Sequence, residues 1–180
     1  APVINNQSFS IAENAPNGAT VATVLASDND ADQTKTFSII SGNLNNAFAI
    51  NSATGVLSVN NSTALNFETI PTFSLIVKVQ DNGIGNLSSQ ATITILVGDV
   101  NEVPVISNQS FLIAENSAAG TVVGTTIATD PDAGQSKIFS ILSGNTNNTF
   151  AINSSSGTIS FVNPAGLHFE LNPMSNITVI

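Results

Sequence analysis

Short runs of alternating apolar and polar residues fill the first hundred or so positions, and turn residues separate them. A period of two places every second side chain on one face, which is typical of half-buried β-strands. Glycine-containing turns such as Asn17-Gly18, Thr54-Gly55 and Asn82-Gly83 stand between the runs. The pattern predicts seven strands, at residues 8–12, 20–26, 36–40, 47–51, 55–60, 72–80 and 90–98. Seven strands in about 100 residues are typical of a Greek-key β-sandwich of immunoglobulin-like type.

The second half of the chain repeats the first. Glu13-Asn14 returns as Glu115-Asn116, 102 positions later, and the same offset relates residues 28–30 to 130–132. It also relates residues 48–51 to 150–153 and residues 65–68 to 167–170, without a gap. Self-similarity over about a whole domain length indicates tandem domains rather than a solenoid of small units. We predict two domains, residues 1–102 and residues 103–180.

The second repeat is predicted to lack its last strand. The offset places the counterparts of strands 72–80 and 90–98 at positions 174–182 and 192–200, whereas the sequence ends at Ile180. We therefore expect an all-β chain of two tandem immunoglobulin-like Greek-key sandwiches, the second truncated at its C-terminus. Continuation of the parent protein would explain this, and a strand supplied by another chain is the alternative.

Composition excludes several classes of function. Hydrophobic residues make up 42% of the chain, which supports a packed core, and the lack of cysteine excludes disulfides. A net charge of −9, with three Lys and no Arg, argues against binding to nucleic acid or to an anionic membrane surface. No run of about 20 apolar residues could insert into a bilayer, and no signal peptide opens the sequence.

The 12 acidic residues are concentrated in a few turn motifs that recur with the repeat. Clustered carboxylates repel one another unless a cation lies between them. Ca²⁺ takes about six to eight oxygen ligands, so such clusters suit it. A single His and no Cys disfavour zinc and copper. Calcium is therefore the predicted cofactor.

The acidic motifs occur in one order along the first repeat. They are Glu13-Asn14 with Gly18, Asp28/Asp30, Leu65-Asn66-Phe67-Glu68, Asp81-Asn82-Gly83, and Asp99-Val100-Asn101-Glu102-Val103-Pro104. In this order the motifs resemble those of the cadherin repeat family, and the first three of them are found again in the second repeat. The resemblance covers essentially the whole chain. It implies an extracellular, cell-surface or secreted protein with calcium at the junction of consecutive repeats.

The resemblance also implies which residues bind calcium at the junction. They are Glu13, Glu68, Asp99, Asn101, Glu102, Asp130, Asp132 and Asn145, with Asn101 and Asn145 acting through their carbonyl oxygens. Two half-sites are implied at the outer ends of the repeats. One comprises Asp28, Asp30 and Asp81, and the other comprises Glu115 and Glu170. They would be completed by a preceding and a following repeat.

Three departures from the family pattern reduce the expected number of ions to one or two. Asn66 and His168 stand where the family motif has Asp, and the linker is one residue shorter than its commoner form. Asn66 can still offer a neutral oxygen. Asp32 is interpreted as a solvated loop acid, because its counterpart is Gly134.

The leading functional hypothesis is a structural and adhesive module, in which calcium makes a rod of repeats rigid. Its partners would be other repeats of the chain and homophilic or heterophilic surface proteins or glycans. Adhesion by exchange of a Trp-anchored strand is disfavoured, because the chain has no Trp. The Asn-, Ser- and Thr-rich, Cys-free composition is more typical of a large bacterial surface protein than of an animal receptor.

A carbohydrate- or ligand-binding accessory module of a secreted protein is the alternative function. The ten Phe recur at strand positions, which favours a role in the core over a sugar-binding platform. An enzyme is disfavoured, since His168 is the only His available to assist a nucleophile.

Overall fold

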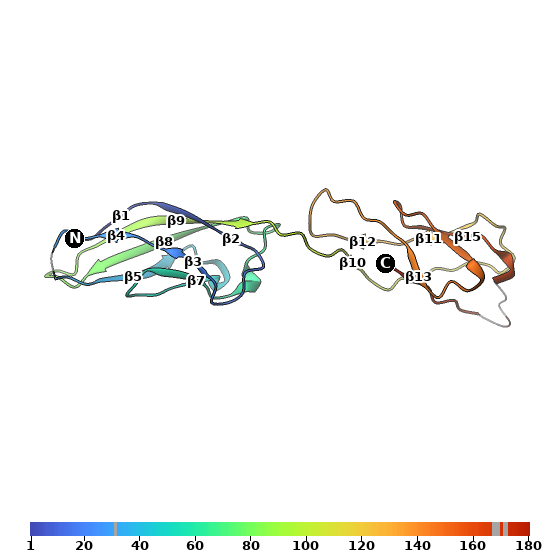
Figure 1. The fold of residues 1–180 in the computed structure, drawn as a ribbon, viewed down its shortest axis with the longest axis horizontal. Coiled ribbons are helices and arrows are strands. Elements are labelled where there is room, and N and C mark those ends of the chain that lie inside the picture. Colours follow the sequence, from blue (N-terminus) through green and yellow to red (C-terminus); the bar gives the residue numbers. More distant parts are fainter. Residues whose placement is uncertain (31, 167–169, 171–172) are drawn as a thin grey trace. The chain divides into compact units, whose positions relative to one another are not determined.

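The computed structural model describes residues 1–30, 32–166, 170 and 173–180. The chain divides into two compact units, Ala1–Asn101 and Glu102–Ile180, each made of strands, turns and short 3-10 segments (Figure 1). The domain boundaries expected from the repeat remain a prediction.

The first unit contains a four-stranded sheet in the order β2-β9-β8-β5 and a three-stranded sheet in the order β3-β7-β6. β1 and β4 form a separate, short antiparallel pair. The strands are β1 Val3–Ile4, β2 Gln7–Ala12, β3 Thr20–Thr23, β4 Ala26–Ser27, β5 Lys35–Ser41, β6 Phe48–Ile50, β7 Val56–Val59, β8 Thr72–Asp81 and β9 Ser88–Gly98. The 3-10 segments are η1 Leu44–Asn46 and η2 Ser62–Ala64.

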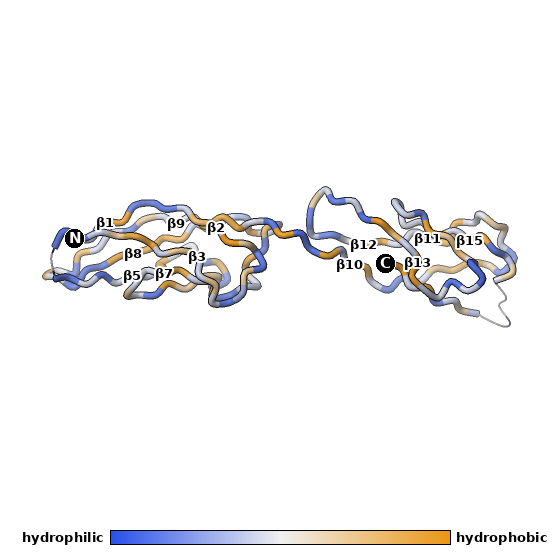
Figure 2. The backbone as a smooth tube through the Cα atoms, in the orientation of Figure 1, coloured by the Kyte–Doolittle hydropathy of each residue, from blue (hydrophilic) through white to orange (hydrophobic). Residues whose placement is uncertain are grey.

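Alternation along the central strands forms the core of the first unit. In β8 the side chains from Phe73 to Val79 are buried at every second position, and β9 does the same from Ala91 to Val97. Phe48 of the opposite sheet meets Phe73 edge-on, with ring centroids 5.1 Å apart and planes at 89°. Figure 2 shows hydrophobic residues recurring along strands such as β8 and β9, among more hydrophilic ones. The predicted β-sandwich is confirmed.

The prediction of one strand at residues 20–26 is wrong, because this segment forms two strands, β3 and β4, that belong to different sheets. The backbone N–H of Val24 donates to Gly55 O. Leu25 N–H donates to Gln7 Oε1, and Gln7 Nε2 donates to Leu25 O, at 3.0 Å each. The chain therefore leaves the β7 edge after Thr23 and pairs with β1 from Ala26 onward.

The second unit keeps part of this arrangement. Its sheets are β11-β15-β14, β10-β12 and β13-β16. The strands are β10 Val105–Ile106, β11 Val122–Thr125, β12 Ala128–Thr129, β13 Ile141–Ser143, β14 Phe150–Ile152, β15 Thr158–Phe161 and β16 Thr178–Val179, with 3-10 segments η3 Thr146–Asn148 and η4 Pro164–Gly166. Its buried centre comprises Phe150, Ile159 and Phe161.

Two strands of the first unit, β2 and β9, have no counterpart in the described part of the second. All the pairs of β2 are with β9, in parallel, from Gln7 opposite Ile93 to Ala12 opposite Gly98. The repeat offset would place the partner strand beyond Ile180 in the given sequence, and residues 109–114 form no strand. The predicted all-β fold is confirmed, and the truncation of the second repeat stays a prediction.

Candidate metal centre

Glu13 lies directly after β2 and is almost completely buried, with 1% of its surface exposed. Its Oε1 accepts a hydrogen bond of 2.8 Å from Val100 N–H, and its Oε2 accepts one of 2.9 Å from Phe67 N–H. The backbone of Glu13 is anchored too, because its N–H donates to Gly98 O. The carboxylate is therefore held rigidly by two backbone segments that follow β7 and β9.

Glu68 and Asp99 bring further carboxylates to the same end of the first unit. Both residues are exposed. A carboxylate oxygen of Glu68 lies within 4.8 Å of one from Glu13, and Glu68 approaches Asp99 within the same distance. No Lys or Arg occurs between Lys78 and Lys137 in the sequence, so the local backbone brings no cationic side chain. The carboxylates of this cluster repel one another, and a positive charge is needed to offset that repulsion.

Asn66 uses its side chain within its own turn. Its Oδ1 accepts hydrogen bonds from the backbone N–H of Thr69, at 2.8 Å, and from the Thr69 hydroxyl. Its Nδ2 donates to Glu68 Oε2 at 3.1 Å. The neutral oxygen that Asn66 was expected to offer to calcium instead accepts two hydrogen bonds from Thr69, and the Nδ2 group of the same side chain faces the Glu68 carboxylate.

In the second unit, Asp130 and Asp132 follow β12 in a tight acidic turn. Asp130 Oδ1 accepts a hydrogen bond of 3.1 Å from Asp132 N–H. Asp132 is 5% exposed, and its Oδ2 accepts one of 2.7 Å from Glu102 N–H. The other oxygen, Oδ1, is buried and has no hydrogen-bond partner among the described residues. Burial of a carboxylate oxygen without a hydrogen-bond partner is costly.

The two predicted carbonyl ligands, Asn101 and Asn145, lie in different surroundings. Asn101 is exposed and follows β9. The Asn145 side chain closes the loop before β14 through hydrogen bonds with Phe150 N–H and O, of 2.9 and 2.7 Å. The backbone carbonyl oxygen of Asn145 accepts a hydrogen bond of 3.2 Å from Asn148 N–H. A carbonyl oxygen has two lone pairs, so this bond uses one of them.

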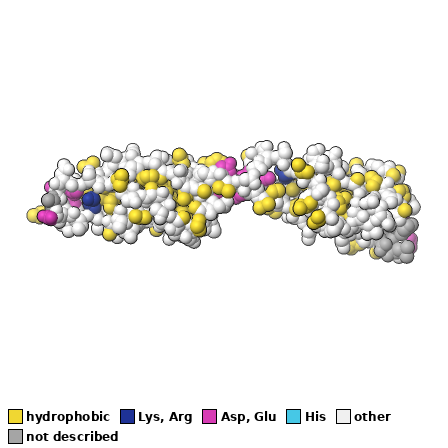
Figure 3. Space-filling view, viewed as in Figure 1, with side chains coloured by type: hydrophobic (Ala, Val, Ile, Leu, Met, Phe, Trp, Pro, Cys, Tyr) yellow, Lys and Arg dark blue, Asp and Glu magenta, His cyan; other side chains and the backbone are white. Residues whose placement is uncertain are grey.

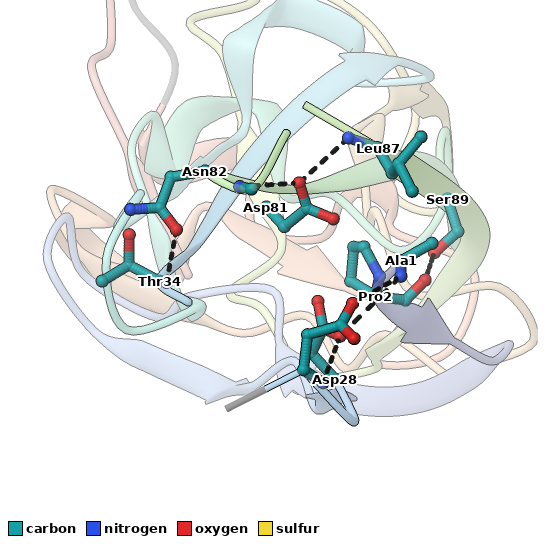
Figure 4. Close-up of polar contacts among 10 residues, drawn as sticks. Ala1, Pro2, Asp28, Thr34, Asp81, Asn82, Leu87 and Ser89 are labelled. Atoms are coloured by element: carbon teal, nitrogen blue, oxygen red, sulfur yellow. Dashed lines mark hydrogen bonds and ion pairs between the residues drawn. The ribbon is translucent and has the colours of Figure 1, made fainter. Parts of the chain in front are cut away.

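The predicted half-site at the N-terminal end of the first unit is shown in Figure 4. Asp28 has a side chain that is 3% exposed, and its Oδ1 accepts from Asp30 N–H at 3.1 Å. Asp81, at the end of β8, accepts from Gly83 N–H and Leu87 N–H through one oxygen. Asp28 Oδ2 is buried without a hydrogen-bond partner among the described residues.

The Ala1 ammonium group lies against this half-site. It is 3.2 Å from Asp30 Oδ2 and 3.9 Å from Asp28 Oδ1 (Figure 4). The hydrogen bond to Asp30 raises the pKa of the amine above its ordinary value, more than partial desolvation lowers it, and the charges of Asp28 and Asp81 act in the same direction as Asp30.

The remaining acidic residues of interest are less constrained. Glu115 is exposed, although its counterpart Glu13 is buried, because no strand of the described residues pairs with residues 109–114. Glu170 is exposed, and His168 lies outside the described residues. Asp32 is exposed, as expected for a loop acid. On the visible face of the first unit in Figure 3, acidic side chains gather at its ends and not along its strands.

The aromatic residues are mainly internal. Of the nine Phe that the structure describes, six are buried, namely Phe37, Phe48, Phe73, Phe139, Phe150 and Phe161. This distribution does not favour the carbohydrate-binding alternative, which needs exposed rings. Within the described residues, no helix has the length and apolar character needed to cross a bilayer.

Tandem β-sandwiches with carboxylates gathered in turns at their ends define a class of extracellular repeat modules. The family model described as Cadherin domain matches residues 7–98 and 109–180. The chain belongs to the cadherin domain family, as its motifs predicted. This is a non-enzymatic adhesion family, in agreement with the expectation that the chain is not an enzyme.

Known proteins of the same family resemble most of the chain. It is 34% identical over 177 residues to protocadherin-11 X-linked of Pongo pygmaeus, and the aligned segment covers 91% of this chain and 13% of that protein. It is 33% identical over 178 residues to cadherin-23 of Rattus norvegicus, covering 95% and 5% respectively. The solved structure of mouse cadherin-23 EC22-24 matches with a TM-score of 0.69 and 24% identity, covering 93% of this chain and 53% of that one. The chain thus spans a small part of these relatives.

Proposed function

We propose that this chain is a calcium-binding structural and adhesion module of an extracellular or cell-surface protein. Calcium would be held where the two repeats join. Its ligands would be Glu13, Glu68, Asp99 and Asn101 from the first unit and Glu102, Asp130, Asp132 and Asn145 from the second. The observation that carries the proposal is the buried, unpartnered Oδ1 of Asp132. A carboxylate oxygen in that state has the charge and the free lone pairs that a divalent cation needs.

The donor chemistry of the first unit supports the same ion. Glu13, Glu68 and Asp99 supply only oxygens, and the chain contains no Cys. Oxygen-only sets suit Ca²⁺ and Mg²⁺, and Ca²⁺ accepts the irregular geometry that loop carboxylates provide. Because Glu13 is held by two backbone N–H groups, it can bind a cation without losing further side-chain entropy. The half-site of Asp28, Asp30 and Asp81 is proposed as a second, incomplete set of the same kind.

Calcium would act on the chain in two ways. It would offset the repulsion among the carboxylates and restrict the motion of one repeat against the next, so that a series of repeats becomes a stiff rod. A ligand that binds only the folded state also stabilises it, by about 2.7 kcal/mol at 100 times Kd. The proposed partners are further repeats and surface proteins or glycans outside the chain, and the proposed location is extracellular.

Titration calorimetry and small-angle scattering, in calcium and in EDTA, test this function. We expect calcium binding that saturates. We also expect the scattering data to show a narrower range of molecular dimensions in calcium than in EDTA. Glu68→Gln should weaken the binding. The matched control is Glu170→Gln, which makes the same change at the repeat-equivalent position and should leave the binding at residues 99–102 intact. Absence of binding in the unmodified chain, with unchanged scattering, would contradict the proposal.

A further inference from the structure

The sequence contains two Asn-Gly peptide bonds, Asn17-Gly18 and Asn82-Gly83, and both lie in turns of the first unit with the Asn exposed. An Asn that precedes Gly is open to attack on its own side chain. The attacking atom is the backbone nitrogen of the Gly, and the absence of a Cβ on that residue lets the backbone approach closely. The two bonds are therefore candidate sites for the same chemical modification.

The electrophile is prepared in the same way at both sites. Thr34 N–H donates to Asn82 Oδ1 at 2.8 Å (Figure 4), and Ser62 N–H donates to Asn17 Oδ1 at 2.6 Å. A backbone N–H can only donate, so each contact fixes which side-chain atom is the oxygen. Each hydrogen bond also stabilises the negative charge that develops on this oxygen when a nucleophile adds to the adjacent carbon.

The nucleophile differs between the two sites. Gly18 N–H donates to the backbone oxygen of Val59 at 2.8 Å, and this oxygen cannot take up the proton. Gly83 N–H donates instead to a carboxylate oxygen, Asp81 Oδ1, at 3.1 Å (Figure 4). This distance lies within reach of a general base, which is about 2.6–3.2 Å. The Asp81 carboxylate is also fixed in place, because it is 5% exposed and the same oxygen accepts from Leu87 N–H at 2.9 Å.

We propose that Asn82-Gly83 is a site of self-modification, at which Asn82 loses its amide nitrogen with Asp81 as the general base. The Gly83 nitrogen bonds to Asn82 Cγ while its proton passes to Asp81. The bond from Cγ to Nδ2 then breaks, and Nδ2 leaves as ammonia with the proton that Asp81 returns. Water adds to one of the two carbonyl carbons of the resulting succinimide, which gives aspartate or isoaspartate at position 82.

The modification alters the turn that follows β8. Either product adds one negative charge next to Asp81. Isoaspartate also lengthens the backbone between Asp81 and Gly83, so the Gly83 N–H can no longer keep its place on the carboxylate. The inference goes beyond the proposed function and does not depend on calcium.

The test follows both Asn-Gly bonds of the chain during incubation at neutral pH in EDTA, once folded and once in urea. Peptide mapping by mass spectrometry measures the conversion of Asn82 and Asn17, and heavy-oxygen water marks the products formed by hydrolysis. In the folded chain Asn82 should convert at least about tenfold faster than Asn17, since a positioned base typically contributes about a hundredfold or more. In urea the two rates should be similar, because neither Gly nitrogen keeps its partner. Equal rates in the folded chain would overturn the inference.

Asp81→Asn removes the base but keeps an oxygen for the two backbone N–H groups. It should slow the conversion of Asn82 at least about tenfold and leave that of Asn17 unchanged. Asn17 serves as the control in the same sample, because a loosened fold would free Gly18 from Val59 and accelerate its conversion. An undiminished rate at Asn82, with Asn17 still slow, would show that Asp81 is not the base. If Asn17 accelerates in the variant, the comparison of the two sites in the unmodified chain decides.

Discussion

Glu13 Oε1 accepts a hydrogen bond of 2.8 Å from the backbone N–H of Val100, 87 positions away in the sequence. Through this contact a buried carboxylate at the end of β2 fixes the segment that leaves β9. The second oxygen of the same carboxylate fixes the turn that contains Asn66 and Glu68, through Phe67 N–H. One side chain therefore positions the two acidic segments, at residues 66–68 and 99–100, that lie at this end of the first unit.

Glu13→Gln should destabilise the first unit by about 2 kcal/mol, even without calcium. The oxygen of the Gln side chain can accept a hydrogen bond from one of the two backbone N–H groups. Its NH₂ group would face the other N–H, so a buried donor would be left without an acceptor. Chemical denaturation in EDTA measures the effect. Glu115→Gln, the same change at the exposed repeat-equivalent position, should cost less than about 0.5 kcal/mol. Equal losses at both positions would contradict the role assigned to Glu13.

Asp132→Asn should have opposite effects with and without calcium. In EDTA the variant should be at least as stable as the unmodified chain, because a neutral amide group replaces a buried carboxylate whose charge is only partly compensated. In calcium it should lose most of the ion-dependent stabilisation. Melting temperatures in both conditions test this. Asp32→Asn, at an exposed loop position, should change neither value. A variant that is destabilised equally in EDTA and in calcium would show that Asp132 has only a structural role.

Gly42→Ala should be far more destabilising than Gly18→Ala. Both glycines have a positive φ, of 79° and 86°, so both substitutions bear a backbone cost of about 1 kcal/mol. A Cβ at position 42 would also lie 1.9 Å from Ser74 O, whereas one at position 18 meets nothing within 4 Å. We expect a difference of about 2 kcal/mol or more between the two variants in urea denaturation. Similar losses would mean that β8 can move away at no cost.

The contact of the Ala1 amine with Asp30 predicts a dependence on alkaline pH. The folded-state pKa of the amine is raised above its unfolded value. Its contribution to stability is therefore complete below the unfolded pKa and is lost as the pH rises through the folded pKa. For the polypeptide that begins at Ala1, the melting temperature should fall over this range. Acetylation of the amine or Asp30→Asn should remove that part of the fall. An identical profile after acetylation would show that the contact contributes nothing.

Much of the fold follows from the sequence because strand formation depends on local alternation. The periodicity of β8 and β9 predicted which residues are buried, and the repeat predicted the second sandwich. The two-residue strand β1 was missed, since a pattern of period two cannot be recognised in so short a segment. The break after Thr23 was missed as well, because the Gln7 side chain that pairs with Leu25 is 18 positions away.

For the candidate site, the sequence by itself determined which residue types gather at the ends of the repeats, since the acidic motifs and their order are local and recur. Only the tertiary structure decided how each side chain is used. It buries Glu13 but leaves Glu115 exposed, because β2 has the parallel partner β9 and residues 109–114 have none. It also turns the Asn66 amide toward Glu68, because Thr69 N–H requires the oxygen. Such outcomes depend on hydrogen bonds formed after the chain has folded, and no motif contains them.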